Sequence, residues 1–531
     1  AIPGFTHVTT ALDATGSGTR YDIGGGQNDG TELTDVPWST LGPGDVVNIY
    51  HRAAPYRNKL LIGARGTATN PVVINGVTDG SGNRPQISGE NAVSINPSEW
   101  ADPAFTTALI MLHRESSTPY GETARYVTFK NLHLKDARDT MQYTHGGVTQ
   151  NYGLRDRLVW SHGAEYIVFE SSIFENSGGG VFVQAPAEKP SKAFRFSGSK
   201  FINNGWPAGP GPSGNEGSTH QIYFQAVSEV GEKNIVEGSA FYNTLDFDVA
   251  QIKIRGTGTI VRYNYVDGAS RIIDLVEAQD EIPEWMFANY TPQELIEEYR
   301  RSDIYGNVIV SDYQMTIPGG GNIHVGWDTL PASGEFDLSQ GGPLSNGQPA
   351  QRGWTAPTYF YHNTYYMRFD DAWSIAVFDL GPLEGDSPYP GVVDARNNII
   401  YLTDNNAGQY GGTRVGWIEA NGHLHQNGAN LVYSADLIRL EESRELAQAE
   451  QTGDDADVDI LQNGVLLTSD PGFVDPHNLV FELKDFNLTA GSPAIGQATA
   501  LPPNLYPVNL QPASPLLGGA ILREDASDLG A

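Results

Sequence analysis

The stretch Thr259-Ile260-Val261-Arg262 is rich in β-forming residues, and the triplet Asn264-Tyr265-Val266 follows it directly. The triplet reads as a polar residue, any residue, and an apolar or aromatic residue. Ser239-Ala240-Phe241 has the same pattern about one coil of a β-solenoid earlier. Further copies are Asn131-Leu132-His133 (a looser match, ending in His), Ser172-Ile173-Phe174, Ser199-Lys200-Phe201, Asn307-Val308-Ile309, Asn363-Thr364-Tyr365 and Asn398-Ile399-Ile400.

This repeat predicts stacked parallel β coils that bury one continuous core. An Asn or Ser at an inward corner can hydrogen-bond to its copies above and below, which satisfies turn backbone groups that would otherwise lack partners. A β-propeller or a stacked sandwich is the alternative, but propeller blades would show four strands per repeat and more regular spacing.

Composition limits the classes of function. The 531-residue chain has 63 Asp and Glu against 32 Lys and Arg, a formal net charge of -31, and no Cys. The acidic excess argues against nucleic acid and anionic membranes as partners, and the lack of Cys excludes disulfides and thiolate metal sites. No apolar run is long enough for a transmembrane helix. We expect a monomeric, secreted or periplasmic protein without membrane insertion, with any signal peptide absent from this chain.

Strands that follow the polar corners predict outward columns, because alternate side chains of a strand face opposite sides. In Ile252-Lys253-Ile254-Arg255 the two isoleucines face inward and the two cations outward. The expected column through Lys253 reads Phe182, Tyr223, Lys253, Asp274, His324 and Ala376, and the neighbouring column reads Gln184, Gln225, Arg255, Val276, Gly326 and Phe378. Two cations on so acidic a protein indicate an anionic ligand, such as an extended polysaccharide. Cross-rung ion pairing without a ligand is the alternative.

The ends of the array resemble those of a known superfamily. Residues 41–89 contain Leu41-Gly42-Pro43-Gly44-Asp45, Asn70-Pro71-Val72-Val73-Ile74 and Pro85-Gln86-Ile87-Ser88-Gly89, and Asn487-Leu488-Thr489-Ala490-Gly491-Ser492-Pro493 lies near the other end. These segments are similar to the first and last coils of right-handed parallel β-helix proteins of the pectin-lyase-like superfamily, particularly the branch of chondroitinase B and β-helical alginate lyases.

The resemblance implies an all-β chain folded as a single right-handed parallel β-helix with loop and short helical insertions. We expect one domain over residues 1–531, with N-terminal capping coils at 1–95, central coils carrying a groove at 96–430, and a helical insertion with C-terminal coils at 431–531. Helical patterns occur at 292–301 and 435–451, and loops rich in Gly and Pro occur at 206–218 and 327–355.

A uronic-acid polymer would be cleaved by β-elimination, which needs a neutralised carboxylate, a base for the C5 proton and an acid for the leaving oxygen. A Lys near other cations becomes a better base, which favours Lys253 beside Arg255. The candidate catalytic residues are Lys253, Arg271, Arg255, Tyr223 and His220. The candidate substrate-binding residues are Gln225, Gln184, Asp274, His324 and Trp206.

Lyases of the resembling branch have paired acids, then a Lys, then an Arg one coil later, and act through Ca²⁺. Asp246, Asp248, Lys253 and Arg271 follow that order here, with Asp in place of Glu. Asp246 and Asp248 are therefore the candidate Ca²⁺ ligands, because Ca²⁺ takes oxygen ligands. No organic cofactor is expected.

Three other classes of protein remain open. A β-helix glycoside hydrolase would use paired carboxylates from Asp246, Asp248, Asp274 and Glu277. A non-catalytic carbohydrate-binding adhesin would keep the groove without the chemistry, and an epimerase would share the proton abstraction of a lyase.

Overall fold

A computed structural model describes residues 18–24, 32–100, 103–113, 122–153, 156–186, 189–205, 220–228, 232–242, 250–256, 258–268, 272–275, 289, 301–313, 321–325, 358–369, 376–379, 392–404, 418–419, 423–426, 429–434, 465–466, 470–478, 484–508, 510–512 and 520–522. The chain divides into two compact units. The first comprises residues 1–239, 243–246 and 280–282, and the second comprises 240–242, 247–279 and 283–531.

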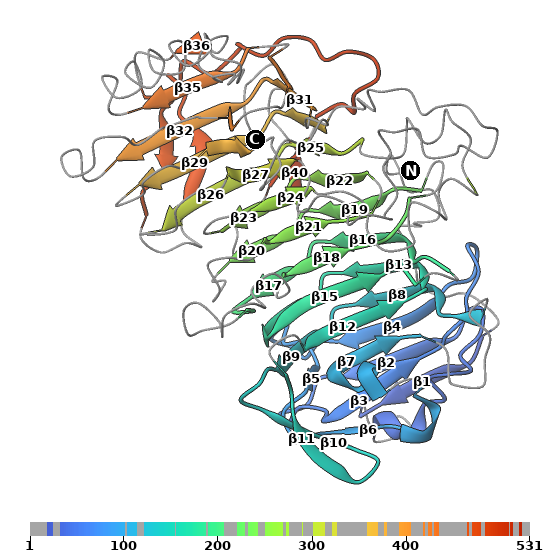
Figure 1. The fold of residues 1–531 in the computed structure, drawn as a ribbon. Coiled ribbons are helices and arrows are strands. Elements are labelled where there is room, and N and C mark those ends of the chain that lie inside the picture. Colours follow the sequence, from blue (N-terminus) through green and yellow to red (C-terminus); the bar gives the residue numbers. More distant parts are fainter. Residues whose placement is uncertain are drawn as a thin grey trace. The chain divides into compact units, whose positions relative to one another are not determined.

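In the first unit each coil visits three sheets in turn, and strands of successive coils pair in parallel (Figure 1). Sheet I contains β3 (Asn58–Ile62), β7 (Ala108–Leu112), β12 (Arg157–His162), β15 (Gly179–Gln184) and β18 (Ile222–Phe224), with β6 (Ala92–Ser94), β10 (Gln142–His145) and the antiparallel β11 (Val148–Asn151) beside β3. Sheet II contains β1 (Arg20–Ile23), β2 (Val46–Tyr50), β4 (Val72–Val77), β8 (Arg125–Lys130), β13 (Glu165–Glu170), β16 (Lys192–Ser197) and β19 (Asn234–Glu237). Sheet III contains β5 (Gln86–Ser88), β9 (His133–Ala137), β14 (Ile173–Ser177) and β17 (Lys200–Ile202), and the short 3-10 helices are η1 (Leu33–Asp35), η2 (Pro97–Glu99) and η3 (Pro103–Thr107).

The second unit repeats this order, and its sheets take the same numerals by their place in the coil. Sheet I contains β21 (Ile252–Ile254), β24 (Ile273–Leu275), β27 (Gly321–Val325), β30 (Ala376–Asp379) and β33 (Ile418–Glu419). Sheet II contains β22 (Thr259–Arg262), β25 (Asp303–Tyr305), β28 (Thr358–Tyr361), β31 (Val392–Arg396) and β34 (His423–Gln426). Sheet III contains β20 (Ala240–Tyr242), β23 (Tyr265–Asp267), β26 (Val308–Tyr313), β29 (Thr364–Phe369), β32 (Ile399–Asp404), β35 (Leu431–Ser434) and β36 (Val465–Leu466). Two antiparallel pairs follow, β37 (Phe473–Asp475) with β38 (Asp485–Leu488) and β39 (Leu510–Pro512) with β40 (Ala520–Leu522).

The described part of each unit is thus built from parallel sheets in the manner of a β-helix, which confirms the predicted fold class. The core consists of like residues stacked coil on coil. Phe129, Phe169 and Phe196 are fully buried, and their rings stack with centroids 4.7 and 5.1 Å apart. The division into capping, central and C-terminal coils stays a prediction.

The predicted polar corners form ladders. In the first unit the backbone N–H of Ser172 donates to Ser199 Oγ at 3.2 Å, and that of Ser199 donates to Ser239 Oγ at 3.1 Å. In the second unit the side chains of Asn264, Asn307, Asn363, Asn398 and Asn430 link in the same way, with backbone N–H to Oδ1 distances from 2.9 to 3.1 Å. Asn430 extends the predicted series by one coil.

One assignment of the repeat was wrong. Leu132, not Asn131, stands opposite Ser172, since the Leu132 N–H donates to Ser172 Oγ at 3.4 Å. Asn131 is a positive-φ residue that donates instead to Asn75 Oδ1 at 3.4 Å. The predicted helical patterns at 292–301 (apart from Arg301) and 435–451, and the loops at 206–218 and 327–355, lie outside the described residues.

Candidate functional site

The second unit places Lys253 directly beside Asp274. The two are Cα partners on the neighbouring strands β21 and β24, and Lys253 Nζ lies 2.9 Å from Asp274 Oδ2. Lys253 alternates with Ile252 and Ile254, which are 0% and 3% exposed. The predicted rung and its register are therefore confirmed.

This ion pair is buried, which the sequence did not indicate. The side chains of Lys253 and Asp274 are 5% and 1% exposed, and Arg255, two residues further on, is 9% exposed. Burying a pair of charges is costly unless their geometry and other hydrogen bonds compensate, so a buried pair is weak evidence for a stabilising role. The Asp274 carboxylate also favours the ammonium form of Lys253, whereas burial favours the neutral form.

The column continues in register to the next strand and then departs from the prediction. Asp274 pairs with His324 on β27, as expected. His324 then pairs with Asp379 on β30, and Ile323 pairs with Phe378. The predicted places of Ala376 and Phe378 were therefore wrong. The stretch that contains them alternates, so the sequence does not fix its register, and a shift by an odd number of residues moves each side chain to the other face of the sheet.

In the first unit the predicted aromatic residues form a column on sheet I. Phe182 pairs in register with Tyr223, and their rings stack with centroids 4.9 Å apart. Trp160 precedes them on β12, 5.6 Å from Phe182, and its Nε1 donates to Gln184 Oε1 at 3.0 Å. Sequence reasoning missed Trp160, although Val159-Trp160-Ser161 alternates in the same way as Val181-Phe182-Val183.

Polar groups surround the Tyr223 end of this column. His220, 3% exposed, meets the Tyr223 ring edge-to-face at 5.3 Å, and Gln225 Nε2 donates to the Tyr223 hydroxyl at 3.4 Å. The Arg157 guanidinium, also missed from the sequence, lies 5.3 Å from the centre of the Phe182 ring. The structure thus brings together Tyr223, His220 and Gln225. An aromatic face next to polar donors is the usual composition of a sugar-binding surface.

Several predicted residues lie outside the described residues. These are Arg271, Trp206 and the two candidate Ca²⁺ ligands Asp246 and Asp248. Within the ranges that the structure describes, no group of three or more His, Asp or Glu side chains is arranged to hold a metal ion. In the same ranges no helix is long and apolar enough to cross a membrane.

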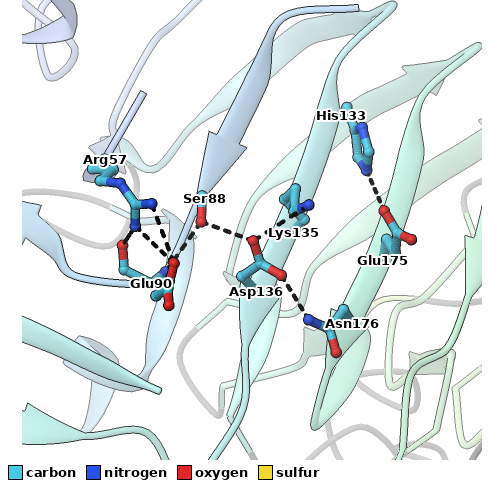
Figure 2. Close-up of polar contacts among 8 residues, drawn as sticks. All are labelled: Arg57, Ser88, Glu90, His133, Lys135, Asp136, Glu175 and Asn176. Carbon is cyan, nitrogen blue, oxygen red and sulfur yellow. Dashed lines mark hydrogen bonds and ion pairs between the residues drawn. The ribbon is translucent and has the colours of Figure 1, made fainter. Parts of the chain in front are cut away.

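A second polar cluster lies on sheet III of the first unit and was not singled out from the sequence (Figure 2). His133 Nε2 lies 2.7 Å from Glu175 Oε2, and this hydrogen bond lowers the pKa of Glu175. Asp136 accepts from Ser88 Oγ at 2.9 Å and from Asn176 Nδ2 at 2.6 Å. Because each of these carboxylates has partners on a neighbouring coil, the cluster links β5, β9 and β14 and offers no reactive group.

Comparison with solved structures finds carbohydrate-active enzymes with very low similarity. A lacto-N-biosidase of family GH136 from Eubacterium ramulus is 12% identical with a TM-score of 0.30, over 79% of this chain and 64% of that one. The present chain therefore spans just under two thirds of that protein. A PL6 family polysaccharide lyase from Pseudopedobacter saltans is 10% identical with a TM-score of 0.31, over 77% of this chain and 93% of that one.

A mannuronic acid specific polysaccharide family 6 lyase from human gut microbiota is 12% identical with a TM-score of 0.30, over 82% of this chain and 94% of that one. No protein-family model and no curated protein sequence matches the chain. Similarities at this level assign neither a family nor an activity.

Proposed function

We propose that this protein is a polysaccharide lyase that cleaves a uronic-acid-containing polysaccharide by β-elimination. The observation that carries the proposal is the buried Lys253–Asp274 pair on β21 and β24, the first two described strands of sheet I in the second unit, with Arg255 two residues beyond Lys253. The reaction requires a cation for the carboxylate, a base for the C5 proton and an acid for the leaving oxygen, and Arg255 and the Lys253–Asp274 pair are the groups that we propose for these roles.

Arg255 is the proposed ligand of the uronate carboxylate. A guanidinium stays charged at any working pH and presents a planar fork of donors that matches a carboxylate. Neutralising the carboxylate makes the adjacent C5 proton more acidic. Since Lys253 lies on the same face of the strand by alternation, its amine is the proposed base for that proton.

Asp274 gives Lys253 a way to act as a base. Burial disfavours charge on both side chains, so we propose that the proton of the Lys253 ammonium passes to Asp274 and leaves a neutral amine. Asp274 Oδ2 lies 2.9 Å from Lys253 Nζ but outside hydrogen-bond geometry, so a small reorientation must precede the transfer. The amine then takes the C5 proton, the C5–H electron pair forms the C4–C5 double bond, and the bond from C4 to the glycosidic oxygen breaks. The new Lys253 ammonium gives a proton to the leaving oxygen. The resulting neutral amine then takes back the proton held by Asp274, which restores the starting ion pair.

The aromatic column of the first unit supports the same class of ligand. Trp160, Phe182 and Tyr223 pack on one another along neighbouring strands, and the partly exposed Trp160 and Phe182 can contact a sugar ring. We propose that this column binds saccharide units, with Gln225 and Gln184 as hydrogen-bonding side chains. Ca²⁺ binding at Asp246 and Asp248, a role for Arg271, and secretion of the protein also remain proposals.

The proposal is tested by incubating the protein with alginate, glucuronan, ulvan, pectate and glycosaminoglycans, and following the ultraviolet absorbance of unsaturated products. A lyase yields an unsaturated end for each bond cleaved. New reducing ends without ultraviolet absorbance would identify a hydrolase, and binding without cleavage would identify an adhesin. Loss of activity with a chelator, and its recovery on adding Ca²⁺, tests the metal proposal.

A further inference from the structure

A column of cations lies on the first unit, where the strands of sheet II begin. Arg65 pairs in register with Arg125, Arg125 with Glu165, and Glu165 with Lys192, so these four residues follow one another coil by coil. Successive positions are about 4.8 Å apart. Lys189 joins the column from the segment before β16, and its Nζ lies 3.6 Å from Glu165 Oε1.

The carboxylates of this column already lie close to cations of the same column. Lys192 Nζ lies 3.8 Å from the same Glu165 oxygen that Lys189 approaches, and Arg65 Nη1 lies 3.8 Å from Glu122 Oε1. Lys189 also donates to Thr123 Oγ1 at 2.9 Å. Four cations therefore face two carboxylates among the described residues of this cluster.

Arg125, in the middle of the column, makes no side-chain hydrogen bond or ion pair with any residue that the structure describes. The Nε atoms of Arg65 and Arg125 are both buried without a hydrogen-bond partner there. Two like charges at paired positions of neighbouring coils repel each other, and a buried donor without an acceptor is costly. Both costs fall if an anion binds between the two guanidinium groups.

A ring platform stands next to the cations. Tyr126 and Tyr166, the residues after Arg125 and Glu165, stack with centroids 4.4 Å apart and planes within 5°. Both have positive φ, 49° and 55°, a conformation that costs a bulky residue free energy and that persists where its surroundings require it. Ala193 takes the corresponding place on the next coil, with φ 50°, so the tyrosine stack ends at Tyr166.

We propose that this surface, formed by Arg65, Arg125, Lys189, Lys192, Tyr126 and Tyr166, is a second binding site for anionic carbohydrate. The guanidinium groups bind the acidic substituent, and Tyr166 packs against a sugar ring. The site takes no part in bond cleavage and retains the polymer on the protein. This proposal rests on the proposed function only in taking the ligand to be an anionic carbohydrate.

The experiment measures binding by calorimetry at several salt concentrations, with the full chain carrying Lys253→Met so that the ligand is not cleaved. The probes are oligogalacturonate, which carries carboxylates, a carrageenan oligosaccharide, which carries sulfates alone, and neutral cellohexaose. Arg125→Ala and Tyr166→Ala are compared with Lys130→Ala. Lys130 is a cation at the far end of the same strand, where it lies 3.7 Å from Glu170, so Lys130→Ala is the matched control.

We expect Arg125→Ala to weaken the binding of at least one charged probe about tenfold, equivalent to about 1.4 kcal/mol, and to make that binding less dependent on salt. The stronger charged probe identifies carboxylate or sulfate as the recognised group. We expect Tyr166→Ala to weaken the same binding, and Lys130→Ala to leave it unchanged.

Equal binding by Arg125→Ala and Lys130→Ala, or equal affinity for cellohexaose and the charged probes, would overturn the proposal. If Tyr166→Ala unfolds at a lower temperature than the parent chain, Arg125→Gln decides the outcome. A wild-type protein that forms no unsaturated product, but whose binding still depends on Arg125, would contradict the lyase function and support this site. Formation of unsaturated product, together with binding that does not depend on Arg125, would support the lyase function and contradict this site.

Discussion

Lys253 Nζ and Asp274 Oδ2 lie 2.9 Å apart on neighbouring coils of the second unit, with both side chains almost fully buried. In that environment, removing one charge of the pair is costly. The pair can therefore exchange a proton and still remain matched, which is the property that the proposed elimination uses.

The first prediction concerns activity. Lys253→Met and Asp274→Asn should each lower the rate of unsaturated product formation by about 100-fold or more, the usual contribution of a positioned acid or base. Asn keeps the shape of Asp but cannot accept the proton. Steady-state rates on the best polymer of the screen measure the effect.

The control for this prediction is another buried ion pair of the same unit. Arg396 Nε donates to Asp394 Oδ1 at 2.8 Å on β31, and both side chains are about as buried as Lys253. Arg396→Met should retain activity wherever the chain remains folded. A similar loss in Arg396→Met and Lys253→Met would show that the loss reflects folding rather than chemistry.

The second prediction concerns stability. Lys253→Met alone should lower the free energy of unfolding by about 3–5 kcal/mol, because it removes the cation that lies 2.9 Å from the buried Asp274 carboxylate. Adding Asp274→Leu should recover most of that loss, since a packed apolar pair replaces two buried charges. Denaturant unfolding measures both, and a double variant no more stable than Lys253→Met would show that the pair stabilises the fold by itself.

The third prediction concerns the pH dependence of stability. Burial raises the pKa of Asp156 from 3.8 to about 6, although the Gly153 N–H, Lys59 and Arg157 act to lower it. A carboxyl whose pKa is raised on folding stabilises the protein at low pH, and this contribution is lost as the pH rises through about 6. The difference corresponds to at most about 3 kcal/mol.

Asp156→Asn should therefore gain stability relative to wild type as the pH rises from 4 to 7. Unfolding followed at several pH values tests this trend. Asp79→Asn should show the opposite trend and lose stability relative to wild type as the pH rises. Hydrogen bonds from Asn83 lower the pKa of Asp79, and a carboxyl whose pKa is lowered on folding stabilises the protein at high pH. A difference between Asp156→Asn and wild type that does not vary with pH would contradict the assignment.

The fourth prediction concerns the asparagine ladder. The Asn307 side chain donates to Asn363 Oδ1 at 2.9 Å and accepts from the Asn264 backbone at 2.9 Å. Asn307→Ala should cost about 1–3 kcal/mol for each buried group left without a partner. Asn487, whose side chain is exposed, is the control, and Asn487→Ala should change stability by about 0.5 kcal/mol or less. Equal effects of the two substitutions would contradict the role of the ladder.

The sequence predicted the features that repeat from coil to coil. Period-two alternation placed Lys253 opposite Asp274 and Phe182 opposite Tyr223, and the polar corners predicted the ladders, because each of these depends on local pattern alone. Asn131 was misassigned because its neighbour Leu132 fills the corner with an apolar residue, which breaks the pattern there.

Features that the local pattern of a strand does not encode were not predictable. The burial of Lys253 depends on what packs over the strand, which alternation does not encode. The pairing of His324 with Asp379 depends on register, and a slip of one residue exchanges the faces. Arg125 and Tyr166 belong to different coils, so their proximity follows only from the stacking.

The central claim is tested most directly by the ultraviolet absorbance of reaction products, compared between wild-type protein and Lys253→Met on the same uronate polymers. The account predicts rising absorbance with at least one polymer for wild type, and about 100-fold less for Lys253→Met with its fold intact. New reducing ends without ultraviolet absorbance, or equal rates for the two proteins, would contradict it.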